Sequence, residues 1–333
     1  MLGLAVTVGL LAWALRGVDL HAVLNHIRQA RVGWLLAAVA IATLTFPLRT
    51  VRWAVILRDA DGRRLPLGPL WHATAVGFMA NNLLPARAGE IARAYMAQRQ
   101  LPVRFTTAVA SIAVERVLDG LTLVGLMVLA LAAPSFSAAS RVGGASLSRL
   151  AVGAALVFGG ALVLALIVVH RPAPWLALLG RVFHWMLPAR LADRLLHAAG
   201  GLVAGLDVLK APRRLVAAVT WSLALWLVNA ASFWICFRAF DLPVPAAGAL
   251  VLQGLIAIGV AIPAAPGFFG VFEAVTREAL ALYGVGAEQA VGYAVAYHLA
   301  TFVPITLLGL YSLSRGHVRL GELRATGAGT PAG

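Results

Sequence analysis

Polar and charged residues are concentrated in NNLLPARAGEIARA, residues 81–94, which directly follows an apolar run. It combines Arg87, Glu90 and Arg93 with a proline and a glycine. An arginine presents a planar fork of N–H groups that binds a phosphate or a carboxylate through paired hydrogen bonds. We therefore predict that Arg87 and Arg93 bind an anionic headgroup, and that Glu90 holds one of them in place.

A second segment, AIPAAPGFFGVFEA at 261–274, repeats the pattern of LLPARAGEIARA at 83–94. In both, an apolar run is followed by Pro-Ala-x-x-Gly, then by a glutamate and an arginine. Backbone breaks at membrane depth are tolerated only where they are buried in protein or line a wet cavity. We predict that the two breaks shape one central site; the alternative is two kinked helix ends near the membrane surface. The predicted break residues are Pro85, Gly89, Pro263, Pro266, Gly267 and Gly270.

Three ionisable residues lie inside a long apolar segment, TTAVASIAVERVLDGLTLVGLMVLALAAP. On a helix, Glu115 and Asp119 share one face at a spacing of four, and Arg116 reaches Asp119 at a spacing of three. Ionisable groups inside a membrane span are costly and are functional candidates by default. Two interpretations stay open: contact with the headgroup, or a structural ion-pair network with the charged residues of the first break.

Glu273 and Asn82 complete the predicted headgroup site. Glu273 would orient an arginine or receive a cationic headgroup moiety. Asn82 and its neighbour Asn81 either bind the headgroup or cap the break, and capping is the simpler reading. His298 lies alone in an apolar run, which is more typical of a hydrogen-bonded packing residue than of a proton relay.

Several common nucleotide-binding and catalytic motifs are missing from the sequence. It has no G-x-x-x-x-G-K-[ST] phosphate loop, no H-E-x-x-H pair and no G-x-S-x-G elbow with a plausible triad. The single cysteine, Cys236, excludes an intramolecular disulfide and a thiol metal site. We accordingly expect no cofactor, no metal and no catalytic residue.

Composition places these residues in a membrane protein. Of the 333 residues, 61% are hydrophobic and 12% charged, where a soluble domain carries about 25% charged residues. The mean hydropathy is +0.88. The net charge of +14 comes almost entirely from arginine, and we interpret it as the positive-inside bias of a membrane protein rather than as a nucleic-acid surface.

The elements that must position the site are apolar helices, because a membrane span needs roughly 20 predominantly apolar residues. We predict an all-α, polytopic membrane protein with re-entrant hairpins beginning at 67–84 and 248–262. An amphipathic piece is expected at 18–31, and helices lying on the membrane surface at 170–214. The six full spans are predicted at 2–15, 33–50, 106–133, 151–169, 215–237 and 290–313.

The predicted organisation is a single transmembrane domain over 1–333, containing two inverted repeats. The first repeat covers 30–140 with its re-entrant element at 67–94, and the second covers 200–315 with its element at 248–283. The tail, 316–333, is expected to be disordered. The N-terminus lacks a positive region and a cleavage site, which favours a retained helix over a signal peptide.

Orientation follows from the distribution of lysine and arginine. With the N-terminus in the cytoplasm, the cytoplasmic segments hold nineteen of these residues and the external segments five. This imbalance fits the positive-inside rule and predicts cytoplasmic termini in a bacterial inner membrane. A full crossing at either re-entrant segment would reverse the loops that follow it.

These residues together resemble the transmembrane domain of lysylphosphatidylglycerol synthases, which also occurs as stand-alone flippase-like proteins. The resemblance runs from about residue 30 to 315. The matching pieces are the arginines and Trp53 within 49–57, N-x-L-P-x-R-x-G-E-x-x-R at 82–93, E-R-x-x-D at 115–119, P-x-x-P-G-x-x-G-x-x-E at 263–273 and H-x-x-x-F-x-P-x-x-x-x-G at 298–309.

The resemblance implies translocation of a lipid between leaflets. In the full-length relatives a separate cytosolic domain makes the aminoacylated lipid, and no segment of this sequence resembles it. We therefore expect membrane lipids as partners, an anionic phospholipid or a glycolipid, with homo-oligomerisation left open. The alternatives are a membrane-embedded lipid-modifying transferase or its subunit, and a small-solute transporter.

Overall fold

The computed structural model describes residues 2–84, 88–132, 141–142, 144–260 and 266–315, and this part of the chain is almost entirely helical. The helices are α1 (Leu2–Ala14), α2 (Leu20–Gln29), α3 (Val32–Ile56), α4 (Leu67–Leu83), α5 (Ala88–Gln100), α6 (Phe105–Leu131), α7 (Leu147–His170), α8 (Pro172–Met186), α9 (Ala189–Gly205), α10 (Pro212–Ala239), α11 (Ala246–Gly259), α12 (Val271–Ala281) and α13 (Ala287–Arg315). Short 3-10 turns, η1 (Asp207–Lys210) and η2 (Pro266–Phe268), precede α10 and α12. Two-residue strands, β1 (Arg141–Val142) and β2 (Ala145–Ser146), pair before α7.

Among the described residues, four helices are long and apolar enough to cross a membrane: α3, α7, α10 and α13. They correspond to four of the six predicted spans. The predicted span at 2–15 is the 13-residue α1, which at 1.5 Å per residue reaches about 20 Å and is short for a core of about 30 Å. The predicted span at 106–133 is the 27-residue α6, whose length suffices but whose middle carries three ionisable residues.

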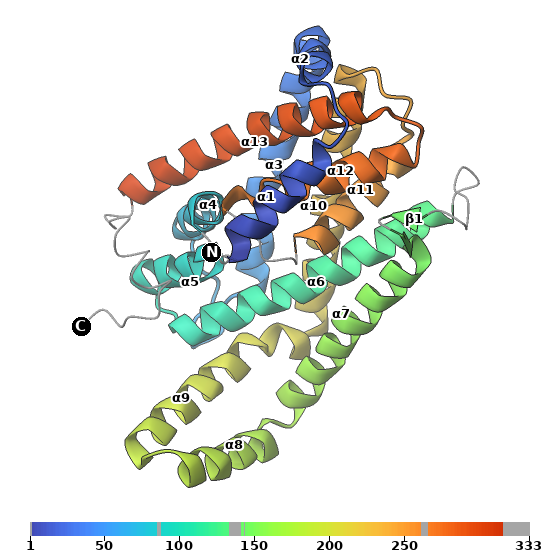
Figure 1. Ribbon diagram of the computed structural model, residues 1–333. Coiled ribbons are helices and arrows are strands. Elements are labelled where there is room, and N and C mark those ends of the chain that lie inside the picture. The colour runs from blue at the N-terminus through green and yellow to red at the C-terminus, as the bar shows by residue number, and fades with distance from the viewer. Residues whose placement is uncertain (1, 85–87, 133–140, 143, 261–265, 316–333) are drawn as a thin grey trace.

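The centre of the molecule is the long contact between α3 and α10 (Figure 1). Around it, α10, α11 and α13 bury a core of aromatic and aliphatic side chains, in which Phe237, Tyr293 and Leu252 are fully enclosed. The ring centroids of Phe237 and Tyr293 lie 5.2 Å apart. Such packing fixes the relative positions of the helices that carry polar residues.

Two pairs of short helices pack on this centre: α4 with α5, and α11 with α12. In turn, α4 lies on α13, and α11 lies on α6. The helices α4 and α5 approach closely because both carry glycine at the crossing. A Cβ atom added to Gly89 would lie 1.9 Å from the carbonyl oxygen of Gly77, so a side chain at this position is excluded.

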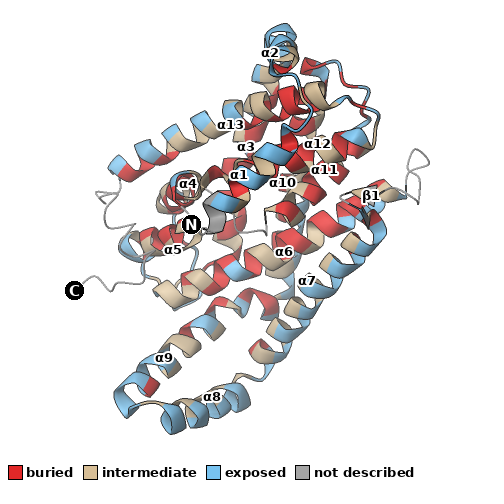
Figure 2. Ribbon diagram, viewed as in Figure 1, coloured by how far each residue is buried: buried red, intermediate tan, exposed pale blue. Residues whose placement is uncertain are grey.

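An arm formed by α7, α8 and α9 extends from the centre (Figure 1). Few residues of α7 are buried despite its apolar sequence, and α8 has no buried residue (Figure 2). Trp185 of α8 is 84% exposed. An apolar helix that the protein leaves uncovered fits a lipid environment. The predicted surface segment 170–214 corresponds to α8, α9 and η1.

The order of helices is the same in two parts of the chain. A long helix, two short helices and a long helix follow one another as α3 to α6 and again as α10 to α13. These parts fall within the predicted repeats, 30–140 and 200–315. That the repeats are inverted and the short pairs re-entrant stays a prediction, and the predicted tail, 316–333, lies outside the described residues.

Candidate functional site

A buried arginine of α3 joins the two carboxylates of α6. Arg52 donates to Glu115 Oε1 at 2.5 Å and to both carboxylate oxygens of Asp119. Ser222 of α10 accepts a further hydrogen bond from Arg52 at 3.0 Å. The side chains of Arg52 and Glu115 are fully buried, so three helices are tied together where no water competes for these bonds. Glu115 and Asp119 lie on one face of α6, as their spacing of four residues predicts, and the guanidinium of Arg52 binds both of them.

Arg93 of α5 supplies the second cation of this network. It pairs with Glu115 at 3.0 Å, and its guanidinium carbon lies 3.8 Å above the ring of Trp53. The indole nitrogen of Trp53 donates to Ser111 Oγ at 3.0 Å, which fixes the ring below the arginine. The structure thus places Arg93 within the ion-pair network, and its role as a headgroup ligand stays a prediction.

Arg116 forms the accessible edge of the network. Its side chain is 35% exposed and contacts Asp119 at 3.1 Å and Glu115 at 3.3 Å, whereas Glu90 lies 3.9 Å from its Nε atom. The contact with Asp119 is the predicted one at a spacing of three. Arg116 and Asp119 belong to the ion-pair network and also line the cavity of about 660 Å³ described below, and their contact with a headgroup stays a prediction.

At the first break, Asn81 and Asn82 make different contacts. Asn81 accepts a hydrogen bond from the backbone N–H of Gly89 at 2.9 Å, so it caps the start of α5. Asn82 donates to Thr306 Oγ1 of α13 at 3.0 Å, which links α4 to α13. Pro85 and Arg87, which were predicted to shape and occupy this break, lie outside the described residues.

The second break is held by a glutamate and a histidine. Gly267 and Gly270 have φ values of 72° and 83°, which glycine adopts without strain. Glu273 accepts a hydrogen bond from the N–H of Gly270 at 2.6 Å and contacts His298 Nδ1 at 2.7 Å. The other ring nitrogen of His298 donates to the carbonyl oxygen of Gly267 at 2.9 Å. His298 therefore contacts Glu273 and Gly267 through both ring nitrogens, and its assignment as a packing residue rather than a proton relay stays a prediction.

Of the other residues predicted for the second break, Pro266 begins η2, and Pro263 lies outside the described residues. The turn η2 packs against α4 of the first pair, so elements of the two predicted repeats meet here. The structure does not bring Glu273 into the ion-pair network of α6. Its described partners are Gly270 and His298.

A cavity with a volume of about 660 Å³ lies among α6, α7, α10 and α11. Its walls are mainly apolar and include Leu123, Met127 and Val157. Charged side chains gather where α3 and α6 meet it. This volume is within the range of about 300–1,000 Å³ of ligand sites. A cavity with apolar walls and a charged end suits an amphipathic ligand.

Arg49 of α3 faces this cavity and was not among the predicted site residues. Only 7% of the residue is exposed, yet it makes no hydrogen bond or ion pair within the described part of the chain. Its guanidinium carbon lies 4.8 Å from the ring centroid of Phe78 and 5.2 Å from that of Trp226. The indole nitrogen of Trp226 in turn donates to Asp119 at 2.7 Å. The two rings hold the cation without satisfying its N–H groups.

The sequence could have indicated Arg49 as a site residue if the predicted span had extended to the true end of α3. The sequence predicts a span that ends at residue 50, with the arginines from Arg49 onward assigned to the cytoplasmic side. In the structure α3 continues to Ile56, and both Arg49 and Arg52 lie buried inside it. Two arginines within one apolar helix are the kind of ionisable group that marks a functional site in a membrane.

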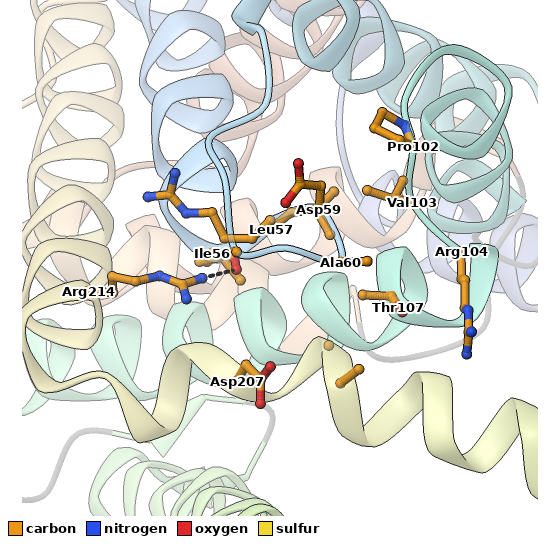
Figure 3. A pocket seen from close by; sticks show the side chains of 14 residues that line it. Ile56, Leu57, Asp59, Ala60, Pro102, Val103, Arg104, Thr107, Asp207 and Arg214 are labelled. Carbon is orange, nitrogen blue, oxygen red and sulfur yellow. Dashed lines mark hydrogen bonds between the residues drawn. The ribbon is translucent and has the colours of Figure 1, made fainter.

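A smaller cavity of about 260 Å³ lies at the C-terminal end of α3 (Figure 3). It is lined by the loop after α3, the start of α6 and the turn before α10. Arg214 donates to the carbonyl oxygen of Ile56 at 2.8 Å and so caps the end of α3. Asp59 accepts hydrogen bonds from the backbone of its own loop, at Asp61 and Arg63. Arg214 and Asp59 are thus engaged in holding the fold.

Comparison with known proteins gives two matches. The sequence model of the family described as lysylphosphatidylglycerol synthase TM region matches residues 1–309. A curated relative, glycosyltransferase AglD of Haloferax volcanii, is 36% identical over 124 residues. That match covers 37% of this chain and 20% of the relative, so the chain spans about a fifth of the relative's length.

Proposed function

The chain belongs to the lysylphosphatidylglycerol synthase transmembrane-region family, and on that premise we propose that it moves an anionic lipid between the leaflets of a bacterial inner membrane. In this proposal the lipid headgroup binds at the charged end of the 660 Å³ cavity, and the acyl chains extend along its apolar walls. Arg49 and Arg116 bind the phosphate, while Asp119 orients the groups around them.

The observation that carries the proposal is the unpaired guanidinium of Arg49. A buried cation without a partner is costly, and folded proteins normally pair it or place it against a ligand. Arg52, three residues further along α3, shows the paired alternative, since it binds both Glu115 and Asp119. Arg49 instead presents free N–H groups to a cavity, where a phosphate would accept several charge-assisted hydrogen bonds.

Lateral access for a lipid is supported by the packing of α7. This helix lines one side of the cavity and packs against α6, where Gly120 leaves room for the ring of Phe158. Within the described residues α7 has no comparable contact with α10 or α11, which line the opposite side. Only Leu147, Ala151 and Val169 of this helix are buried. A helix attached along one edge leaves a path between cavity and bilayer.

The pattern of helix contacts supports two inverted repeats. If α3 to α6 correspond to α10 to α13, then the contact of α4 with α13 corresponds to that of α11 with α6. The contact of α3 with α10 corresponds to itself, as expected for a two-fold relation. Transporters built from inverted repeats bind their substrates between the repeats near the middle of the membrane. In this proposal both short pairs are re-entrant, and the termini lie in the cytoplasm.

Enzymatic action on a lipid is the second candidate, because the matching relative is named a glycosyltransferase. A lipid-modifying enzyme or its subunit would use the same cavity to hold the lipid. The two candidates differ in their outcome: a translocator returns the lipid chemically unchanged in the other leaflet, whereas a transferase changes its mass. Mass spectrometry of the lipids recovered from the assay below distinguishes them.

Translocation is tested with purified protein in liposomes that contain a fluorescent phosphatidylglycerol, whose outer-leaflet fraction is quenched by dithionite. We expect Arg49→Lys to slow translocation about tenfold, because a charge-assisted, forked contact worth about 1.5–3 kcal/mol is lost while the charge remains. The matched control is Arg238→Lys. Arg238 also stacks on a tryptophan, at 5.2 Å from Trp234, but it is exposed and lies away from the cavity.

Stability measurements separate a ligand-binding arginine from a structural one. Arg49→Gln removes an unpaired buried charge, so the thermal unfolding temperature in detergent should stay unchanged or rise. Loss of a paired buried arginine should lower that temperature. Arg87→Lys, studied in the same assay, tests the clamp predicted at the first break. Translocation at the wild-type rate in both Arg49 variants would overturn the proposal, and uptake of a water-soluble solute instead of lipid would favour a solute transporter.

A further inference from the structure

We propose that the lipid bound in the 660 Å³ cavity carries an uncharged, hydroxyl-bearing group beside its phosphate, such as a glycerol or a sugar. This inference rests on the proposed lipid translocation and specifies the headgroup. It is carried by the amide pair Asn229 and Gln253, two neutral polar residues that line a cavity with otherwise charged or mainly apolar walls.

The two amides come from different helices and satisfy each other only in part. Asn229 of α10 donates from Nδ2 to Gln253 Oε1 of α11 at 3.2 Å. Gln253 is 2% exposed, and its Nε2 atom is buried without a hydrogen-bond partner. Among the described residues, the carbonyl oxygen of Asn229 also accepts no hydrogen bond. Whichever way the amides are turned, the pair offers one free donor group and one free acceptor.

A free hydrogen-bond donor next to a free acceptor favours ligand groups that can both donate and accept. A phosphate only accepts hydrogen bonds and an ammonium only donates them, so either would leave half of the amide pair unsatisfied. A hydroxyl both donates and accepts, and two neighbouring hydroxyls can bind both amides at once. Because an unmet hydrogen bond in a buried site is costly, a polyol is the group that best satisfies this pair.

The charges of the cavity disfavour a cationic headgroup. The described lining contains Arg49, Arg116 and Arg149 but only one acidic residue, Asp119. That carboxylate already accepts from Arg52, from Arg116 and from the indole of Trp226. An ammonium in this cavity would therefore find arginines among the lining side chains and no unengaged carboxylate. A neutral group beside a phosphate avoids this repulsion.

The spacing of the two subsites matches a small headgroup. Trp226, which stacks on Arg49, and Asn229 are three residues apart on α10, a rise of about 4.5 Å along the helix. The residues of α10 that contribute to the two subsites are thus neighbours on one turn of the helix. In this proposal a single headgroup occupies both subsites.

The test is a comparison of lipids that share the phosphate and differ beyond it. Phosphatidylmethanol has the same charge as phosphatidylglycerol and phosphatidylinositol but has no hydroxyl, and phosphatidylethanolamine adds an ammonium. We expect native mass spectrometry of the purified full chain to give a dissociation constant about tenfold lower for at least one of the two polyol lipids than for phosphatidylmethanol. Phosphatidylethanolamine should bind no more tightly than phosphatidylmethanol.

Variants assign any preference to the amides. Gln253→Met keeps the length of the side chain and removes its polar atoms, and Asn229→Leu does the same on α10. Each should bring the ratio of the two dissociation constants, polyol lipid to phosphatidylmethanol, close to one. A general effect on folding would not change this ratio. Arg49→Gln should weaken all the phosphate lipids and leave the ratio unchanged.

The outcomes separate this inference from the proposed function. If wild-type protein binds all phosphate lipids equally and Arg49→Gln weakens them, the hydroxyl subsite is wrong and lipid binding stands. The subsite is also wrong if phosphatidylethanolamine binds most tightly, or if the preference for polyols survives in both amide variants. If no lipid binds, the proposed function fails together with the inference.

Discussion

Each break places a glutamate after a proline and a glycine that are four residues apart, but the structure surrounds these glutamates differently. Glu90, at the first break, is 35% exposed and its described ionic contact is a loose one of 3.9 Å to Arg116. Glu273, at the second break, is 4% exposed and bridges a backbone N–H and a histidine. The following arginines differ as well, since Arg93 joins the buried network and Arg277 binds carbonyl oxygens at the end of α1.

The difference lies in what the neighbouring long helix contributes. Beside the first break, α6 carries two acids that attract arginines from α3 and α5. Beside the second, α13 carries a histidine flanked by Phe269 and Phe272, at ring distances of 4.5 Å and 4.6 Å. Similar local sequences therefore give a multi-residue ion network in one place and a single hydrogen-bonded pair in the other. The break motif determines the path of the backbone, whereas the neighbouring long helix determines which partners the polar side chains of the break find.

The largest effect is expected from Glu115→Gln. An amide in this position leaves Arg93 without the carboxylate that it pairs with and leaves Arg52 with Asp119 as its remaining carboxylate. One end of the amide also presents N–H groups to the N–H groups of these arginines. Orphaned buried charges cost about 3–5 kcal/mol, and we expect a loss of stability of this size. Denaturant unfolding in detergent measures it. A variant as stable as wild type would show that the ion network does not stabilise the fold.

Glu273 should tolerate the same exchange. In Glu273→Gln the amide oxygen can accept from Gly270, and the amide nitrogen can donate to His298 Nδ1, because the other ring nitrogen already faces the carbonyl of Gly267. We expect a change below about 1 kcal/mol. Glu273→Ala leaves both partners unsatisfied and should cost about 2–3 kcal/mol.

The same unfolding measurement decides whether the two glutamates really differ. Losses of equal size for the glutamine exchange at Glu115 and at Glu273 would remove the distinction between network and pair. If Glu273→Gln is the more damaging of the two, His298 must hold a positive charge that only a carboxylate balances.

The smallest effect is expected from Glu90→Gln. The ion pair to Arg116 is long and partly exposed, and such pairs contribute about 0–1 kcal/mol. Stability should fall by no more than this, and Arg116 should keep its contacts with Asp119. A loss of several kcal/mol would mean that Glu90 holds a buried cation, for which Arg87 of the first break is the candidate.

Much of the fold could be predicted because it follows from local sequence. Long apolar runs predict α3, α7, α10 and α13, and the proline–glycine breaks separate α4 from α5 and α11 from α12. The family was likewise predicted from motifs along the chain, and the match over residues 1–309 confirms it. Helix boundaries were less accurate where charge interrupts an apolar run, as at the end of α3.

The sequence by itself determined that this is an all-helical membrane protein of a lipid-related family with two broken helix pairs, because apolar length and backbone breaks act over a few residues. The tertiary structure alone decided which arginines are paired. Arg52 meets Asp119, 67 residues away, and Arg49 lies against Trp226 of yet another helix. The two arginines are three positions apart in the same apolar segment, and the sequence gives no reason to expect different partners for them. Only the packing of α3 against α6 and α10 gives one of them two carboxylates and leaves the other facing a cavity.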